Sequence, residues 1–148
     1  MNAERLKALF LCTGNSCRSQ MAEGWARELK SDVLQAWSAG VAPHGIDPRA
    51  VRVMEEVGVD ISAQRSKDVE ELMDIPFDYV VTLCGGANET CPVFVGKTRR
   101  LHVGFDDPPA LAKEAGSEEE ALKIYRRVRD EIRAFVKTLP DGLPTLDT

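Results

Sequence analysis

The sequence predicts a single α/β domain with a doubly wound, four-stranded parallel sheet flanked by helices. Short apolar runs alternate along the chain with stretches whose apolar residues recur at helical spacing, which is typical of strand–helix–strand units. The chain has 148 residues, which is long enough to bury one sizeable core. Because no repeat or linker divides the chain, we expect one domain over residues 1–139 and an irregular tail over residues 140–148.

The first three predicted elements are two strands with a helix between them. Residues 7–12 form an apolar run, typical of a strand buried in a parallel sheet. Residues 18–30 carry apolar side chains on one face of a helix. Residues 33–39 form the second strand, which ends at Gly40, and we assign Trp37 within it to packing on the sheet.

The middle of the chain contains two predicted helices and the third strand. Residues 47–58 form a helix, because an aspartate followed by proline favours a helix start and a glycine favours its end. We expect Ser66 to cap a short helix over residues 66–74. Residues 79–83 form the third strand, which finishes at Cys84.

The last part of the chain supplies a short fourth strand over residues 99–103 and a long helix over residues 117–138. The helix opens with the capping-box pattern at Ser117, and its apolar stripe is assigned to the core. In doubly wound sheets, ligands bind beyond the carboxyl ends of the strands. Cys12 and Cys84 both end predicted strands, so we expect them to face one crevice.

The composition is that of an ordinary soluble globular protein, with 43% hydrophobic and 29% charged residues. The net charge of -5 argues against non-specific binding to nucleic acid, and no basic run suggests a membrane surface. We expect a cytoplasmic protein, because the opening residues do not resemble a signal peptide. Four cysteines in such a protein favour reduced, catalytic or metal-binding roles. The two histidines, His44 and His102, are isolated, and we expect core or surface roles for them.

The stretch between the first strand and the first helix contains the residues most suited to chemistry. A tight loop at a helix N-terminus directs backbone N–H groups toward an anion, and Arg18 adds a planar fork that can bind a tetrahedral oxyanion. We expect this field to lower the pKa of Cys12, so that its thiolate attacks a phosphate-like centre. The alternative is a buried cysteine at an ordinary strand end. The predicted anion-binding residues are Thr13, Gly14, Asn15, Ser16, Cys17, Arg18 and Ser19.

The pattern Cys-x5-Arg-Ser at residues 12–19 resembles the signature loop of the low-molecular-weight phosphatases. The longer string over residues 12–25 is similar to that of the thioredoxin-coupled arsenate reductases, which share that fold. The resemblance extends from about residue 6 to residue 136 and includes the segments around residues 84–92 and 104–108. It implies arsenate as the substrate, phosphate or sulfate as mimics, and thioredoxin as the source of electrons with no bound cofactor.

Cys84 and Cys91 are not needed by a simple phosphatase. As a pair they could form half of a zinc site, pack as buried structural residues, or take part in a redox relay. The glycines between them favour the relay, because they allow the backbone to rearrange. The resemblance implies that Cys12 attacks arsenate, that Cys84 then attacks Cys12 and releases arsenite, and that Cys91 attacks Cys84. Thioredoxin would reduce the resulting Cys84–Cys91 disulfide.

The resemblance also implies that Asp107, the acid immediately before a proline, is the general acid. Protonation of the departing oxygen makes it a better leaving group. The adjacent Asp106 is the alternative, and we favour Asp107. Cys17 either forms a reversible protective disulfide with Cys12 or is a small residue packed on the helix.

One departure from the arsenate reductase pattern concerns a cation site. Some members bind potassium beside the anion loop through residues that match Asn15, Glu23, Ser38 and an aspartate. The first three are present here, but Lys67 stands where the aspartate is expected. We hypothesise that the Lys67 ammonium takes the place of the cation and pairs with Glu23, so that the protein holds no metal and needs no potassium.

Two other functions remain open. A low-molecular-weight phosphatase acting on phosphotyrosine or small aryl phosphates through a Cys12 phospho-enzyme would use Cys12, Arg18 and Asp107 equally well. Pro109 and Ala110 weaken that alternative, because phosphotyrosine enzymes tend to have an aromatic residue at this position. A thiol-based metalloid or redox sensor would leave Arg18 and Asp107 without a role. We therefore expect a monomeric arsenate reductase of arsenical detoxification, with weak phosphatase side activity.

Overall fold

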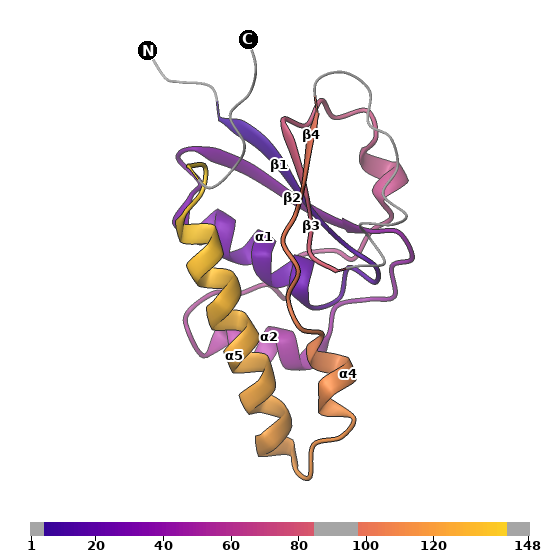
Figure 1. The fold of residues 1–148 in the computed structure, drawn as a ribbon, viewed down its shortest axis with the longest axis vertical. Helices are drawn as coiled ribbons and strands as arrows, with labels where there is room; N and C mark the ends of the chain where they lie inside the picture. Colours follow the sequence, from indigo (N-terminus) through magenta and orange to yellow (C-terminus); the bar gives the residue numbers. More distant parts are fainter. Residues whose placement is uncertain (1–4, 85–97, 142–148) are drawn as a thin grey trace.

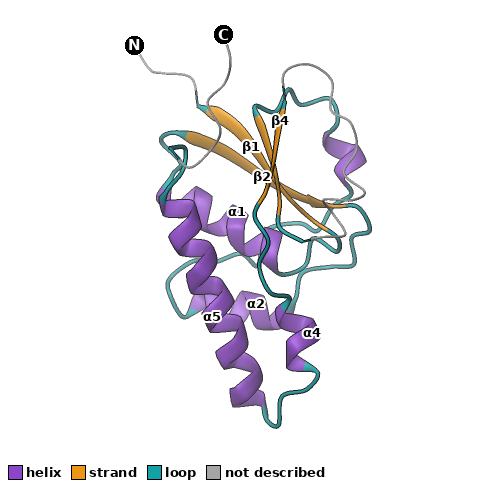
Figure 2. Ribbon diagram, viewed as in Figure 1, coloured by secondary structure: helices purple, strands orange, loops and turns teal. Residues whose placement is uncertain are grey.

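The computed structural model describes residues 5–84 and 98–141. Four parallel strands form one sheet in the order β2-β1-β3-β4. The strands are β1 (Leu6–Cys12), β2 (Leu34–Gly40), β3 (Tyr79–Thr82) and β4 (Arg99–His102). Helices pack against this sheet (Figures 1 and 2), so the predicted α/β fold class is confirmed.

The strand order places a topological switch point between β1 and β3. The chain moves from β1 to β2 on one side, and β3 and β4 lie on the other side. Leu11 pairs with Thr82 at the carboxyl ends of the two central strands. Ligands of doubly wound sheets bind in the crevice outside such a switch point. Cys12 ends β1 and Cys84 follows β3 closely, so both residues reach this crevice.

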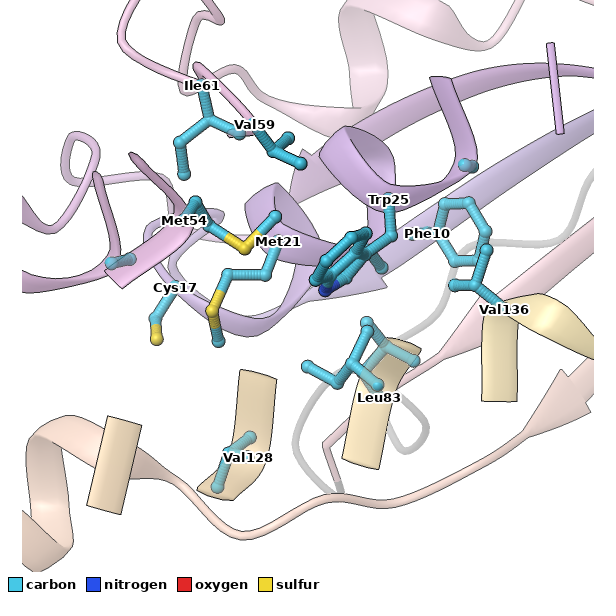
Figure 3. Packing of buried hydrophobic residues seen from close by; sticks show 14 of the residues in the cluster. Phe10, Cys17, Met21, Trp25, Met54, Val59, Ile61, Leu83, Val128 and Val136 are labelled. Carbon is cyan, nitrogen blue, oxygen red and sulfur yellow. The ribbon is translucent and has the colours of Figure 1, made fainter. Parts of the chain in front are cut away.

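Three helices cover one face of the sheet and contain most of the apolar core. They are α1 (Arg18–Leu29), α2 (Pro48–Glu55) and α5 (Glu118–Lys137). Met21 and Trp25 of α1 pack between the sheet and Val128 of α5, as Figure 3 shows. The indole Nε1 of Trp25 donates to the carbonyl of Arg129 at 3.1 Å. The buried indole nitrogen therefore has a hydrogen-bond partner, and this bond connects α1 to α5.

The opposite face of the sheet is covered by the short 3-10 helix η1 (Val69–Leu72) and the segment after it. The predicted helix over residues 66–74 with Ser66 as its cap was wrong. Asp68 caps η1 instead, with a capping box completed by Glu71. The physical reason is that the carbonyl of Lys67 accepts a hydrogen bond from Gly40 N at 2.8 Å. This pairing keeps the preceding backbone extended along β2.

A further helix, α4 (Pro108–Ala112), was not predicted from the sequence. Asp107 occupies its N-cap position and Pro108 its first position, an aspartate–proline start of the same kind as the one that opens α2. The tail prediction falls mainly on residues 142–148, which lie outside the described residues. Within residues 5–84 and 98–141, none of the helices has the length and apolar character required to span a bilayer.

Candidate active site

The loop between β1 and α1 is fixed by its own side chains. Cys12 is the last residue of β1, and Arg18 is the first residue of α1. Asn15 adopts a positive φ of 47°, which asparagine tolerates better than most residues. Its Nδ2 donates to Ser19 Oγ at 2.9 Å, and both side chains are buried. This buried hydrogen bond therefore holds the loop in its turn from the side of the protein core.

A cavity of about 420 Å³ opens over this loop. Asn15 and Ser19, which were expected to bind the substrate, are not among its lining residues, because they support the loop from inside the fold. Cys12 and Cys84 both line the cavity, as the strand topology predicted. The lining residues are Cys12, Thr13, Gly14, Ser16, Cys17, Arg18, His44, Cys84, Asp107 and Pro109.

Arg18 connects the anion loop to the segment before α4. Its Nη1 donates to the carbonyl of Phe105 at 3.0 Å, and its Nη2 lies 3.5 Å from Oδ1 of Asp107. The Arg18 side chain is only 11% exposed, whereas that of Asp107 is 46% exposed. Asp106 instead pairs with Arg127 of α5 at 2.9 Å. Of these two adjacent acids, Asp107 is the one that faces Arg18 and lines the cavity.

The protonation of Cys12 differs from the sequence prediction. The pKa of Cys12 is raised, first by a hydrogen bond with Cys84 and then by burial. The charge of Arg18 and the backbone N–H of Thr13 act in the opposite direction, but they are outweighed. The prediction of a lowered pKa was wrong because it considered the anion loop without the second thiol. Cys12 therefore holds its proton in this arrangement, and its ionisation is coupled to that of Cys84.

Cys84 lies beside the anion loop and in contact with it. It is buried, and its Sγ lies 3.2 Å from Oγ1 of Thr13. The Thr13 hydroxyl can donate to a Cys84 thiolate, which would stabilise the ionised form. No disulfide joins Cys12, Cys17 and Cys84 to one another. Cys91, the third thiol of the predicted relay, lies outside the described residues.

Cys17 lines the cavity but also belongs to the hydrophobic core. It precedes α1 as its N-cap residue and makes no side-chain capping bond. Its side chain is buried, and Figure 3 shows it beside Met21. Burial raises the pKa of Cys17, and the carboxylate of Asp47 raises it further. These surroundings favour a protonated packing residue over a second reactive thiol.

The four residues of the expected cation site meet beneath the anion loop. Ser38 Oγ donates to Oε1 of Glu23 at 2.6 Å. Lys67 Nζ lies 3.8 Å from the same oxygen and donates to the carbonyl of Arg65 at 2.9 Å. The backbone N–H of Lys67 donates to Oδ1 of Asn15 at 2.9 Å. The Lys67 ammonium therefore lies beside Glu23, where the cation hypothesis requires it.

His44 is a lining residue whose place the sequence did not reveal. Its backbone N–H donates to the carbonyl of Gly14 at 3.1 Å. The imidazole ring of His44 occupies the space that a Cβ atom on Gly14 would take, so the ring lies directly against the loop. His102 is exposed, and its Nδ1 lies 2.9 Å from Oγ1 of Thr82. Within the described ranges, no group of three or more histidine, cysteine, aspartate or glutamate residues could hold a metal ion.

Comparison with known proteins identifies relatives over nearly the whole chain. Residues 7–144 match the family described as low molecular weight phosphotyrosine protein phosphatase. An arsenate reductase from Halalkalibacterium halodurans is 48% identical over 132 residues, which are 89% of this chain and 93% of that protein. An arsenate reductase from Bacillus subtilis is 51% identical over 123 residues, 83% of this chain and 86% of that protein.

Solved structures agree with these relatives. A structure described as an arsenate reductase in the phosphate binding state has a TM-score of 0.72 at 32% identity and covers 94% of this chain and 99% of that chain. A low molecular weight protein tyrosine phosphatase from T. tengcongensis has a TM-score of 0.69 at 29% identity, with coverage of 93% and 99%. Both the reductases and the phosphatases of this fold are thus similar to the chain.

Proposed function

Since the chain belongs to the low molecular weight phosphotyrosine protein phosphatase family, and within it to the arsenate reductases, we propose that it reduces arsenate to arsenite with the thiols of Cys12, Cys84 and Cys91. The observation that carries this proposal is the pair of thiols in one cavity. Cys84 hydrogen-bonds with Cys12, and both line the same space. A phosphatase needs one nucleophilic thiol, whereas reduction of As(V) needs two electrons, which a second thiol supplies.

The first step is attack on arsenate held by the anion loop. Arg18, now bonded to the carbonyl of Phe105, would turn its guanidinium toward two arsenate oxygens. Because Cys12 holds a proton, that proton passes to the arriving oxyanion as the thiolate forms. The Cys12 sulfur then forms a bond to arsenic while one As–O bond breaks. Asp107 takes a proton from the bound arsenate, which has received that of Cys12, and gives it to the departing hydroxyl group, which leaves as water.

The second step transfers the electrons. The Cys84 thiolate attacks Cys12 Sγ and forms a disulfide, while the S–As bond breaks and its electron pair remains on arsenic. Arsenic is thereby reduced from As(V) to As(III) and leaves as arsenite. Cys91 next attacks Cys84, which releases Cys12 as a thiolate and leaves a Cys84–Cys91 disulfide. Two thiols are oxidised and one arsenate is reduced, so the electrons balance.

The third step reduces the Cys84–Cys91 disulfide back to two thiols. We assign this step to the dithiol of a thioredoxin, because the oxidising equivalents are presented as a disulfide within one chain. The reaction then needs no bound cofactor, and it suits the cytoplasm, where thiols are kept reduced. Every group in the scheme comes from one chain, which favours a monomer.

The test is oxidation of NADPH in the presence of arsenate, thioredoxin and thioredoxin reductase, with cleavage of p-nitrophenyl phosphate measured in parallel. We expect sustained NADPH loss that requires arsenate, and at most slow aryl phosphate cleavage by the shared anion loop. Brisk phosphate cleavage without arsenate-driven NADPH loss would instead establish a phosphatase.

Single cysteine variants test the order of the relay. Cys12→Ser should abolish both reactions, whereas Cys91→Ser should release about one equivalent of arsenite and then stop, because Cys84 has no partner to continue the exchange. Cys17→Ser is the matched control and should cycle, since the Cys17 thiol takes no part in the scheme and the backbone amide is kept. Normal cycling of Cys91→Ser with thioredoxin would refute the three-thiol relay.

A further inference from the structure

The backbone carbonyls of the anion loop are held from outside by residues 42–47. Three hydrogen bonds run from Ala42 N to Thr13 O (2.8 Å), from His44 N to Gly14 O (3.1 Å) and from Asp47 N to Ser16 O (2.9 Å). In a planar trans peptide, the N–H points away from the C=O of the same unit. The bond that turns the Ser16 carbonyl toward Asp47 therefore turns the N–H of Cys17 in the opposite direction. Cys17 itself is one of the residues that line the cavity.

Asp47 is held in turn by two donors, one on each carboxylate oxygen. Oδ1 accepts from Arg49 N at 2.9 Å, which caps α2. Oδ2 accepts from the hydroxyl of Tyr125, a residue of α5 that is only 1% exposed. Arg49 lies over the Tyr125 ring at 5.9 Å and bonds to Glu118 at 3.0 and 2.9 Å. The position of Asp47 is therefore set jointly by α2 and α5.

These contacts form a continuous connection from the core helix to the anion loop. We propose that Asp47 and Tyr125 are positioning residues for the oxyanion site: the Tyr125 hydroxyl fixes Asp47, Asp47 N–H fixes the Ser16 carbonyl, and the Cys17 amide is thereby directed at the bound anion. Neither Asp47 nor Tyr125 is among the residues that line the cavity, so both would act through the loop backbone. The inference depends on the proposed function only in requiring that the loop binds a tetrahedral oxyanion.

The charge of Asp47 gives the Tyr125 hydroxyl a second effect. The carboxylate is near enough to the loop to raise the pKa of Cys17, so it also opposes an anion bound there. Tyr125 remains a proton donor, because burial and the contact with Asp47 both raise its pKa. A hydrogen bond from Tyr125 stabilises this charge on the outer side of the loop. Loss of the hydroxyl should therefore weaken anion binding through both geometry and charge.

The test uses inorganic phosphate as the probe and titration calorimetry as the measurement. We expect Tyr125→Phe to raise the Kd for phosphate by about three- to tenfold, the effect of losing one hydrogen bond. Ile132→Val is the matched control, because Ile132 is a fully buried residue of the same helix and the variant loses one methylene group. It should lower the stability of the protein about as much as Tyr125→Phe does, and it should leave the Kd for phosphate unchanged.

A second variant tests whether the two residues act through one contact. Asp47→Ser keeps a capping side chain for α2 but removes the partner of Tyr125 together with the charge that opposes the anion, so it is the background in which the effect of Tyr125→Phe is measured. If both residues act through the same hydrogen bond, the double variant should bind phosphate no more weakly than Asp47→Ser alone. Fully additive losses would overturn the proposed connection.

The remaining outcomes also decide the question. Unchanged phosphate binding by Tyr125→Phe, or equal weakening in Ile132→Val, would overturn the positioning role. A wild-type protein that does not bind phosphate would overturn the oxyanion site itself and the positioning role with it. Phosphate binding that responds as expected, in a protein that does not reduce arsenate, would support the positioning role and overturn only the proposed function.

Discussion

Replacing Lys67 with methionine tests whether its ammonium acts as a built-in cation beneath the anion loop. Lys67 Nζ lies 3.8 Å from Oε1 of Glu23, whose side chain is only 2% exposed. Methionine keeps most of the length of the apolar stem, so the change removes mainly the charge and the hydrogen bond to the carbonyl of Arg65. Glu23 keeps two other partners, Arg27 at 2.7 Å and Ser38 at 2.6 Å.

The expected loss of stability follows from two opposing effects. At an effective dielectric constant of about 20, two unit charges 3.8 Å apart attract by about 4 kcal/mol. Much of this is offset, because burial lowers the pKa of Lys67 even with Glu23 beside it. Losing one partner of a buried pair costs about 3–5 kcal/mol when the other charge is left alone. Since Glu23 retains Arg27 and Ser38, we expect Lys67→Met to lower the free energy of unfolding by about 1–3 kcal/mol.

Urea denaturation at fixed ionic strength measures this loss, with Lys123→Met as the control because Lys123 is exposed on α5. A loss of stability no greater in Lys67→Met than in the control would refute the reasoning.

The same measurement in potassium and in sodium tests the hypothesis that Lys67 takes the place of a bound cation. The wild type should not distinguish the two salts, whereas Lys67→Asp, which restores a carboxylate, should become more stable in potassium. A wild-type protein whose activity rose strongly with potassium over sodium would contradict the hypothesis.

Two further predictions concern the cavity. Asp107→Asn should slow single-turnover arsenate reduction by about 10²–10⁴-fold, because the departing oxygen loses its proton donor. The control Asp106→Asn should change the rate little, since Asp106 pairs with Arg127 on the surface. Equal losses of rate in the two variants would show that Asp107 is not the general acid. Cys84→Ala should lower the pKa of Cys12, since the hydrogen bond with Cys84 is the largest cause of its elevation. The rate of Cys12 alkylation by iodoacetamide, measured against pH, should then rise at lower pH than in the wild type, and an unmoved profile would contradict this cause.

Local signals in the sequence were enough to predict the frame of the site. Apolar runs locate β1, β2 and β3, and the pairing of an aspartate with a proline locates the start of α2 at Pro48. The carboxyl ends of β1 and β3 then bring Cys12 and Cys84 to one cavity, because parallel strands end at the same edge. Each of these inferences depends on spacing along the chain or on a general rule of topology.

The features that the sequence did not reveal depend on contacts between distant segments. The effect of Cys84 on the pKa of Cys12 requires their side chains to meet, and no spacing encodes that contact. His44 lines the cavity because residues 42–47 pair with the anion loop, which only the folded chain shows. The 3-10 helix η1 begins later than expected because Lys67 pairs with Gly40 across the fold.

The contacts of Cys84 fit a relay of thiols better than they fit a phosphatase. Attack on arsenate and attack on a phosphate ester both need the Cys12 thiolate, so the second thiol is what separates the two reactions. In a relay, two thiols must act in a fixed order, and the contacts of Cys84 impose one. While Cys12 is a free thiol, it hydrogen-bonds with Cys84. Once its sulfur is bonded to arsenic, that hydrogen bond is lost and Thr13 Oγ1, 3.2 Å away, remains to stabilise a Cys84 thiolate. Formation of the first adduct therefore prepares the second thiol for its attack.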